Sequence, residues 1–294
     1  MKDARESGGR TTRVGILGGS GLYDLELASR EEVSVATPFG DPSDSFVLGE
    51  ISGRPVAFLA RHGRGHRISP SEINYRANVF GFKKLGCDML LSASAVGSLR
   101  EELAPSHVCI PSQFIDRTRA RADTFYGGGI VVHVSLADPV CPDGSRELAR
   151  SCREAGAPVR EGGIYVGMEG PPFSTRAESN LYRSWGADVI GMTNVTESKL
   201  AREAEICYAS MALVTDYDCW REATEAVSVD TVLAVLRGNA DMARRALVSA
   251  VARIDPARTC GCRDALRYAI VTDPARIPDR VKKDLAPLVG RYLA

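Results

Sequence analysis

Residues 197–220, "ESKLAREAEICYASMALVTDYDCW", show the fold class most clearly. "ESKLAREAE" has the pattern of a helix, and the apolar run "ICYASMALV" is typical of a buried strand. Two carboxylates, Asp216 and Asp218, follow that strand one residue apart. Because side chains alternate between faces in an extended segment, both are expected to point the same way. They either belong to a solvated loop or line a pocket that presents two acceptors, or one acceptor and one proton donor, to a ligand.

The same alternation of strand and helix runs through the whole chain. Further strands are predicted in "VGILGG", "RPVAFLARHG", "CDMLLSASAVGS", "HVCIPSQFID", "GGIYVGMEG" and "ADVIGMT". Helices are predicted in "DGSRELARSCREAG", from Ser228 to about Ile254, and from about Pro278. This order predicts a single-domain α/β fold with a mostly parallel sheet at residues 13–294, after a flexible tail at residues 1–12.

Two further helices carry recognisable start signals. Ser69 is predicted to cap a helix that has Pro70 at its first position, Glu72 completing a capping box and an end at Gly86. In "STRAESNLYRSWG", Ser174 is predicted to be the N-cap.

Composition excludes several classes of partner. The 294 residues are 44% hydrophobic and 25% charged, and Lys+Arg balances Asp+Glu at 37 each. With no net charge, the chain has no bulk field to recruit nucleic acid or an acidic membrane surface. No apolar run reaches the ~18 residues of a spanning helix. The eight cysteines lie mostly alone in apolar stretches, which favours a cytoplasmic chain with reduced thiols.

The predicted strands end in an unusually polar set of residues, where α/β sheets bind their ligands. "GGSG" is a glycine turn that either cradles a phosphate, with Ser20 as a donor, or simply turns the chain. "ARHGRGH" contains Arg61, His62 and His66, and is either a phosphate site or a solvated basic loop. Ser94 and Thr193 add hydroxyls to the same edge. Together these ends predict an anion site, and the lack of a nucleophile motif indicates that the bound phosphate is the attacking group.

Long, ordered motifs then identify a family. "GILGGSGLYD", "RHGRGHRISPSEINYRAN", "GSLREELAPSHVCIPSQFIDRT", "EGPPFSTRAES", "WGADVIGMT" and "AREAEICYASMALVTDYDCW" resemble S-methyl-5'-thioadenosine phosphorylases, a branch of the trimeric purine nucleoside phosphorylases. The resemblance runs from about Val14 to about Ile254. It implies a single α/β domain around a mixed, partly barrel-like sheet flanked by helices. It also implies phosphorolysis of methylthioadenosine to adenine and 5-methylthioribose 1-phosphate in purine and methionine salvage, without a metal or organic cofactor.

The resemblance also implies roles for individual residues. Asp216 and Asp218 would read N7 and the 6-amino group of the purine, and one of them would donate the proton that N7 needs. The phosphate-binding residues would be Ser20, Arg61, His62, Ser94, Ala95 and Thr193. The other substrate contacts would be Met192 at the ribose, Phe173 and Ser174 at the purine, and, around the methylthio group, His66, His133, Val229 and Val232.

Three places depart from the family pattern or add to it. "NVTES" has Thr196 where the family has proline, although Glu197 is kept, and "EGPPF" has Pro172 where arginine is usual. Cys260 and Cys262 form "CGC", which resembles a paired-cysteine feature of some members. Three states of these two cysteines stay open: free thiols, a strained or exchanging disulfide, or a metal site whose further ligands cannot be identified from the sequence.

Two other functions remain open. One is a purine nucleoside or methylthioinosine phosphorylase with a 6-oxopurine preference, against which "TDYD" argues because asparagine would suit that edge better. The other is a nucleoside-binding protein without turnover. The expected partners are the small-molecule nucleoside and phosphate, with neither nucleic acid nor membrane, in a homotrimer or a hexamer formed as a dimer of trimers.

Overall fold

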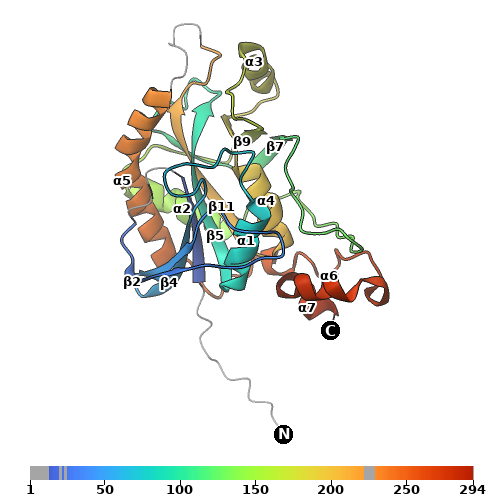
Figure 1. Cartoon of the computed structure of the whole chain (residues 1–294). Coiled ribbons are helices and arrows are strands. Elements are labelled where there is room, and N and C mark those ends of the chain that lie inside the picture. Colours follow the sequence, from blue (N-terminus) through green and yellow to red (C-terminus); the bar gives the residue numbers. More distant parts are fainter. Residues whose placement is uncertain (1–12, 20–21, 23–24, 222–228, 294) are drawn as a thin grey trace.

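An eleven-stranded sheet forms the centre of the molecule in this computed structural model (Figure 1). The structure describes residues 13–19, 22, 25–221 and 229–293, so the predicted tail at 1–12 lies outside it. The strands are β1 (Arg13–Gly18), β2 (Ala28–Val33), β3 (Phe46–Ile51), β4 (Arg54–Ala60), β5 (Cys87–Ser98), β6 (Val108–Ile110), β7 (Gln113–Arg117), β8 (Val159–Glu161), β9 (Ile164–Met168), β10 (Val189–Gly191) and β11 (Cys207–Asp216).

Helices cover both faces of this sheet (Figure 1). They are α1 (Tyr75–Lys84), α2 (Pro142–Glu154), α3 (Arg176–Ser184), α4 (Asn194–Glu203), α5 (Val229–Arg253), α6 (Asp279–Asp284) and α7 (Ala286–Leu293). Helices α2 and α5 pack into one hydrophobic core, and α1 and α4 pack into a second one across the sheet. Within the described residues, no helix combines the length and the apolar character needed to cross a bilayer.

The sheet is mixed, as the family resemblance implied. β5 lies between β1 and β11 and is parallel to both, and β1 is also parallel to β4. The pairs β2–β3, β3–β4, β5–β10 and β6–β11 are antiparallel. The strand-and-helix alternation alone predicted a mostly parallel sheet, and six of the ten strand pairs among the described residues are parallel. It missed β2 and β3, which follow one another without an intervening helix.

Strand β11 accounts for the apolar run at residues 206–214. Its residues Cys207 to Thr215 are all buried, because helices cover both faces of the strand. A strand buried on both faces carries a continuous apolar run rather than an alternating one. The predicted strand at 206–214 and the long helix starting near Ser228 are therefore confirmed within one or two residues.

The predicted helix start at Ser69 is wrong. The helix α1 begins at Tyr75, and its N-cap is Asn74, whose side chain accepts a hydrogen bond from the Ala77 N–H. Ser69 and Glu72 do exchange hydrogen bonds, from the Ser69 N–H to the Glu72 carboxylate (3.1 Å) and from the Glu72 N–H to the Ser69 carbonyl. They close a tight turn before the helix instead of capping it, so a capping-box pattern was satisfied by a turn.

The predicted cap of α3 is off by one residue. Thr175, not Ser174, is the N-cap, and its side chain accepts from the Glu178 N–H while Glu178 reaches back to Thr175. This is a complete capping box, and it fixes where the 170–175 loop turns into the helix.

Candidate active site

One cavity of about 550 Å³ lies at the polar strand ends. Its walls come from the ends of β4, β10 and β11, from the middle of β5, from α5 and from the loop after β4. The lining residues used below are Gly19, Arg61, His62, His66, Ser94, Ala95, Gly97, Phe173, Met192, Thr193, Thr215, Asp216 and Asp218. The expectation that the strand ends converge is therefore confirmed.

Arg61 is almost fully buried and pairs with Glu197 beneath the cavity. Its Nε donates to Glu197, Nη2 donates to Ser92 Oγ (2.7 Å), and Nη1 donates to the Ala93 carbonyl (3.0 Å). Burial works against the guanidinium charge, but the Glu197 carboxylate outweighs it and raises the pKa of Arg61. Glu197 therefore holds the Nε and Nη2 edge of the guanidinium. The remaining nitrogen, Nη1, lies beside Gly19, which lines the cavity.

Glu197 belongs to a buried network that reaches the cavity wall. Its carboxylate also accepts from Ser92 Oγ and from the Tyr208 hydroxyl, both at 2.8 Å. Asn194 donates to Tyr208 at 2.8 Å and accepts from the Ser94 hydroxyl at 2.6 Å. Such a network fixes each donor in one orientation, because every member is held by another.

The two histidines of the loop after β4 stack on each other, with ring centroids 4.2 Å apart. His62 Nδ1 lies 2.9 Å from the Ile68 carbonyl, which only accepts, so Nδ1 carries the proton. Burial, and then the charge of Arg61, lower the pKa of His62 to about 3. At neutral pH His62 is therefore an uncharged imidazole whose Nε2 has a lone pair.

Asp216 and Asp218 both line the cavity, but not for the predicted reason. β11 ends at Asp216, and Asp218 has a positive φ of 52°, so the segment is not extended there. The Asp218 N–H donates to Asp216 Oδ1 (2.7 Å) and closes a tight turn. A Cβ on Gly97 would lie 3.0 Å from Asp216 Oδ1 and 3.2 Å from the Asp218 Cβ, so glycine on β5 leaves room for both carboxylates.

Burial raises the pKa of both carboxyl groups. At Asp216 this is opposed by the Thr215 hydroxyl, which donates to Oδ2 at 2.7 Å. At Asp218 the nearby Asp216 charge adds to the increase. Two close carboxyls with raised pKa values hold a shared proton more readily than an exposed pair.

The structure brings together most, but not all, of the predicted site residues. Ser174 does not line the cavity; its hydroxyl contacts Met168 Sδ at 3.7 Å. His133 is exposed, does not line the cavity in this chain, and donates its backbone N–H to the Ala269 carbonyl (2.9 Å). Ser20 lies outside the described residues, as do the side chains of Val229 and Val232 on α5.

Several contributors were not predicted from the sequence. Thr215 and Gly97 act beside the carboxylates, and Arg121 fastens the opposite rim. The Arg121 guanidinium is buried and donates to the carbonyls of Met192, Met168 and Glu169. Arg121 is one of three arginines in "RTRARAD", and nothing local distinguishes it because the carbonyls that it contacts belong to residues distant in the sequence.

The two departures from the family pattern lie beside these contacts. Thr196 is buried in α4, and its hydroxyl accepts from Arg121 Nη1 at 3.4 Å. Pro172 is exposed next to Phe173, on the loop before α3. Thr196 thus adds a side-chain acceptor where a proline would have none.

The fold and the cavity define a phosphorylase. Residues 13–252 match the Phosphorylase superfamily, and the chain belongs to it. More narrowly, the chain belongs to the S-methyl-5'-thioadenosine phosphorylase family. The Geobacter sulfurreducens protein of that name is 57% identical over 95% of this chain and 99% of its own length. The Koribacter versatilis protein is 54% identical over 95% and 96%.

Solved structures give the same result. A methylthioadenosine phosphorylase from an antarctic soil metagenomic library has a TM-score of 0.90 and 47% identity over 95% of this chain and 99% of its own. A mutant adenosine/methylthioadenosine phosphorylase from Schistosoma mansoni, in complex with methylthioadenosine, has a TM-score of 0.77 and 40% identity over 82% and 91%.

Proposed function

We propose that this chain catalyses the phosphorolysis of S-methyl-5'-thioadenosine, with inorganic phosphate as co-substrate. One observation carries the proposal: strand β5 presents an anion-binding end and an acidic end to one cavity. The Ala93 carbonyl holds Arg61, and four residues along β5 Gly97 faces the two carboxylates. At 3.3 Å per residue these ends lie about 13 Å apart, with room between them for a nucleoside.

In this proposal an oxygen of phosphate attacks the ribosyl C1' as the bond to the purine N9 breaks. The electron pair of that bond passes to the purine, and a proton from the Asp216–Asp218 pair goes to N7. Positive charge develops at C1' and is stabilised by the phosphate dianion. Adenine and 5-methylthioribose 1-phosphate are the products.

We assign the phosphate end to Arg61 Nη1, to the hydroxyls of Ser94 and Thr193, and to His62, whose Nε2 accepts a hydrogen bond from the protonated oxygen of the phosphate dianion. Ser20 and the backbone of Ala95 complete that end in the proposal. The carboxylates form the purine end with Phe173, while Met192 lies against the ribose. His66, Val229 and Val232 are assigned to the methylthio group.

We further propose that His133 completes the cavity of a neighbouring subunit in a homotrimer, either alone or within a hexamer formed as a dimer of trimers. His133 stands on an exposed apolar patch formed by Val131 (49% exposed), Tyr268 (92%) and Val271 (65%). The Val271 N–H donates to the Val131 carbonyl, so the patch is ordered by the fold. Large apolar side chains gathered at the surface are typical of interfaces between proteins.

Replacement of Asp216 by asparagine tests the substrate assignment. The amide donates to a 6-oxo group, which a carboxylate repels, so the ratio of kcat/KM for methylthioadenosine to that for methylthioinosine is expected to fall steeply. Asp218→Asn is expected to act in the same direction. Asp143→Asn, on the partly exposed first turn of α2, serves as the control and leaves the ratio unchanged. A folded Asp216→Asn enzyme with the wild-type ratio and turnover would overturn the purine assignment, and a wild-type preference for methylthioinosine would establish the 6-oxopurine alternative.

A further inference from the structure

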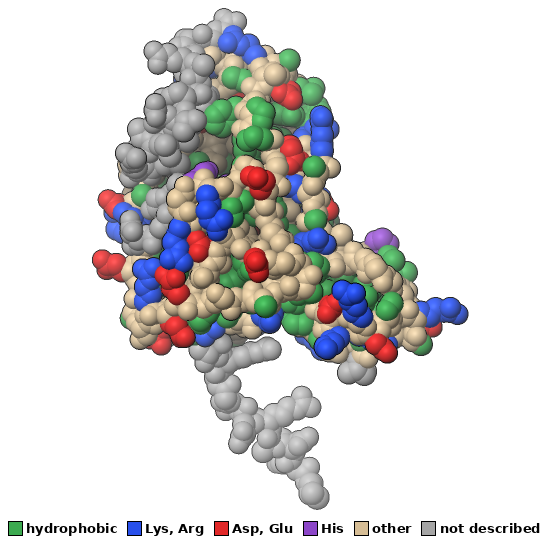
Figure 2. All heavy atoms as spheres, in the orientation of Figure 1, with side chains coloured by type: hydrophobic (Ala, Val, Ile, Leu, Met, Phe, Trp, Pro, Cys, Tyr) green, Lys and Arg blue, Asp and Glu red, His purple; other side chains and the backbone are tan. Residues whose placement is uncertain are grey.

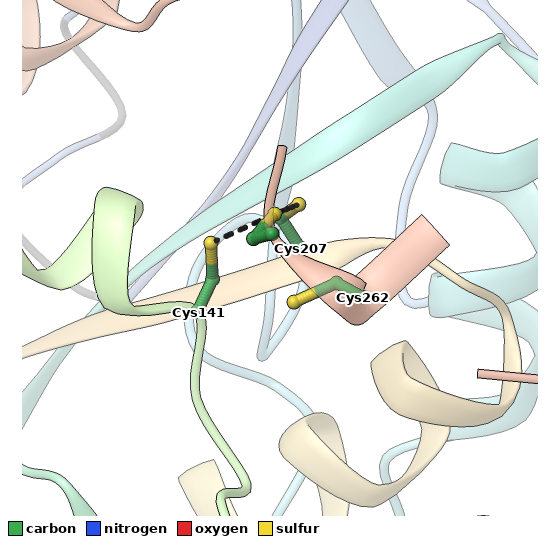
Figure 3. Close-up of side chains that lie close together, drawn as sticks. Cys141, Cys207 and Cys262 are labelled. Atoms are coloured by element: carbon green, nitrogen blue, oxygen red, sulfur yellow. Dashed lines mark hydrogen bonds between the residues drawn. The ribbon is translucent and has the colours of Figure 1, made fainter. Parts of the chain in front are cut away.

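Four cysteines that are distant in the sequence meet at the end of β11 opposite the cavity. Cys207 is the first residue of β11, Cys141 is the N-cap of α2, and Cys260 and Cys262 flank Gly261 at the start of a short 3-10 helix. Their sulfurs all lie within 4.8 Å of one another. Figure 3 shows Cys141, Cys207 and Cys262 close together, although they come from three separate segments of the chain. The two ligands that the "CGC" motif lacked are therefore supplied by Cys141 and Cys207.

We propose that one Zn²⁺ ion binds at this centre as a structural site, held by the sulfurs of Cys141, Cys207, Cys260 and Cys262. A tetrahedral zinc–thiolate site has Zn–S bonds of about 2.3 Å, so neighbouring sulfurs lie about 3.8 Å apart. The sulfur of Cys260 is 3.6 Å from that of Cys141 and 3.3 Å from that of Cys207. These separations fit a single ion and leave no room for the sulfide bridges of an iron–sulfur cluster.

The spacing of the sulfurs argues against two disulfides. A disulfide joins two sulfurs at about 2.0 Å and separates that pair from other sulfurs. Here Cys260 lies at similar distances from two partners, and the eight cysteines of the chain are all free thiols in the structure. One ion bound by all four sulfurs accounts for these similar distances, whereas a disulfide between two of the cysteines would bring one pair much closer than the others.

Arg258 gives an independent indication of negative charge at this centre. Its buried guanidinium donates from Nε to Cys207 Sγ (3.3 Å) and also pairs with Asp88 at 2.9 Å. Four thiolates around Zn²⁺ have a net charge of −2, and a buried N–H donor on a ligand sulfur partly compensates it.

The site would fasten the C-terminal segment to the sheet. The Cys141 N–H donates to the Tyr208 carbonyl at 2.7 Å, so two ligands are already held by the sheet. Cys260 and Cys262 belong to the segment that leads from α5 to α6 and α7. With four protein ligands the ion has no open position, so its role is stability rather than catalysis.

The test begins with the wild-type protein. Mass spectrometric metal analysis of protein purified without chelator is expected to give about one zinc ion per chain. Replacement by Co²⁺ is expected to give the visible absorption of a tetrahedral tetrathiolate. Thiol titration of the denatured, unreduced protein with chelator is expected to find all eight thiols. Less than a tenth of an equivalent of zinc, iron in its place, or fewer than eight thiols would overturn the proposal.

Variants then locate the metal. Cys260→Ala and Cys262→Ala are expected to lose the zinc and to lower Tm. The matched control is Cys152→Ala, because Cys152 is a buried cysteine of α2 outside the cluster and is expected to keep the zinc. Zinc retained in both cluster variants would refute the site. Metal content is independent of turnover, so this result does not depend on the proposed reaction.

Discussion

The buried pair Arg61–Glu197 allows structural and ligand-binding roles to be separated by a double-mutant cycle. Both side chains are almost fully buried, with 1% and 0% of their side-chain surface exposed. Removing one partner leaves the other charge buried and uncompensated, which typically costs about 3–5 kcal/mol. Arg61→Met and Glu197→Gln are each expected to lower the free energy of unfolding by about that amount. The double variant buries no charge at this position and is expected to recover most of the loss.

Phosphate affinity is expected to behave differently. A charge-assisted hydrogen bond from Arg61 Nη1 to phosphate contributes about 1.5–3 kcal/mol, which corresponds to roughly 10- to 100-fold in KM for phosphate. Arg61→Met and the double variant should both show this increase, while KM for methylthioadenosine changes much less. Stability therefore returns in the double variant and phosphate affinity does not.

The assays are urea unfolding and steady-state titration of each substrate. Arg64→Met is the matched control, because Arg64 follows on the same loop but is half-exposed and pairs with Glu32 and Asp44 at the surface, where ion pairs contribute little. Recovery of phosphate affinity together with stability would show that Arg61 acts only through the fold. A double variant as unstable as either single variant would contradict the energetics of the pair.

Three further predictions follow from the same contacts. Burial raises the pKa of Glu203 to about 7, so the folded state favours the protonated form, and stability is lost as the pH rises from about 4.5 through 7. Glu203→Gln should remove this pH dependence, which amounts to up to ~3 kcal/mol in the free energy of unfolding measured with urea. An unchanged dependence of stability on pH in the variant would contradict this reasoning. If His133 of one subunit completes the cavity of its neighbour, coexpressed His133→Ala and Asp216→Asn chains should form mixed oligomers with some intact cavities. These oligomers should show activity that neither variant has alone. Verified mixed oligomers without that activity would refute shared sites. Gly97→Ala should lower kcat/KM for methylthioadenosine by crowding both carboxylates, and full activity would show that this close approach is unnecessary.

How far the sequence predicted the site depends on the range of the interactions. The strand ends and the acid pair were predictable, because each lies within one local pattern of apolar and polar residues. The turn at Asp218 was not, because a hydrogen bond between its N–H and Asp216 Oδ1 overrides the alternation of an extended strand. The balance of charges in the sequence also agrees with the surface, because basic and acidic side chains are interspersed on the face shown in Figure 2.

The remaining features join residues that are far apart in the chain. Glu197 was noticed only as a kept family residue, and its partner Arg61 lies 136 positions away. The polar contacts around Arg121 and the cysteine centre depend in the same way on which strands become neighbours. No local pattern contains that information, so these contacts appear only once the sheet order is known.

The products of the wild-type enzyme give the most direct test of the proposed phosphorolysis. Purified protein is incubated with methylthioadenosine with and without phosphate, and both adenine and 5-methylthioribose 1-phosphate are quantified by chromatography with mass spectrometry. We predict equal amounts of the two products, formed only when phosphate is present. Adenine with free methylthioribose in the absence of phosphate would indicate hydrolysis, and nucleoside binding with neither product would show a protein without turnover; either result would contradict the account.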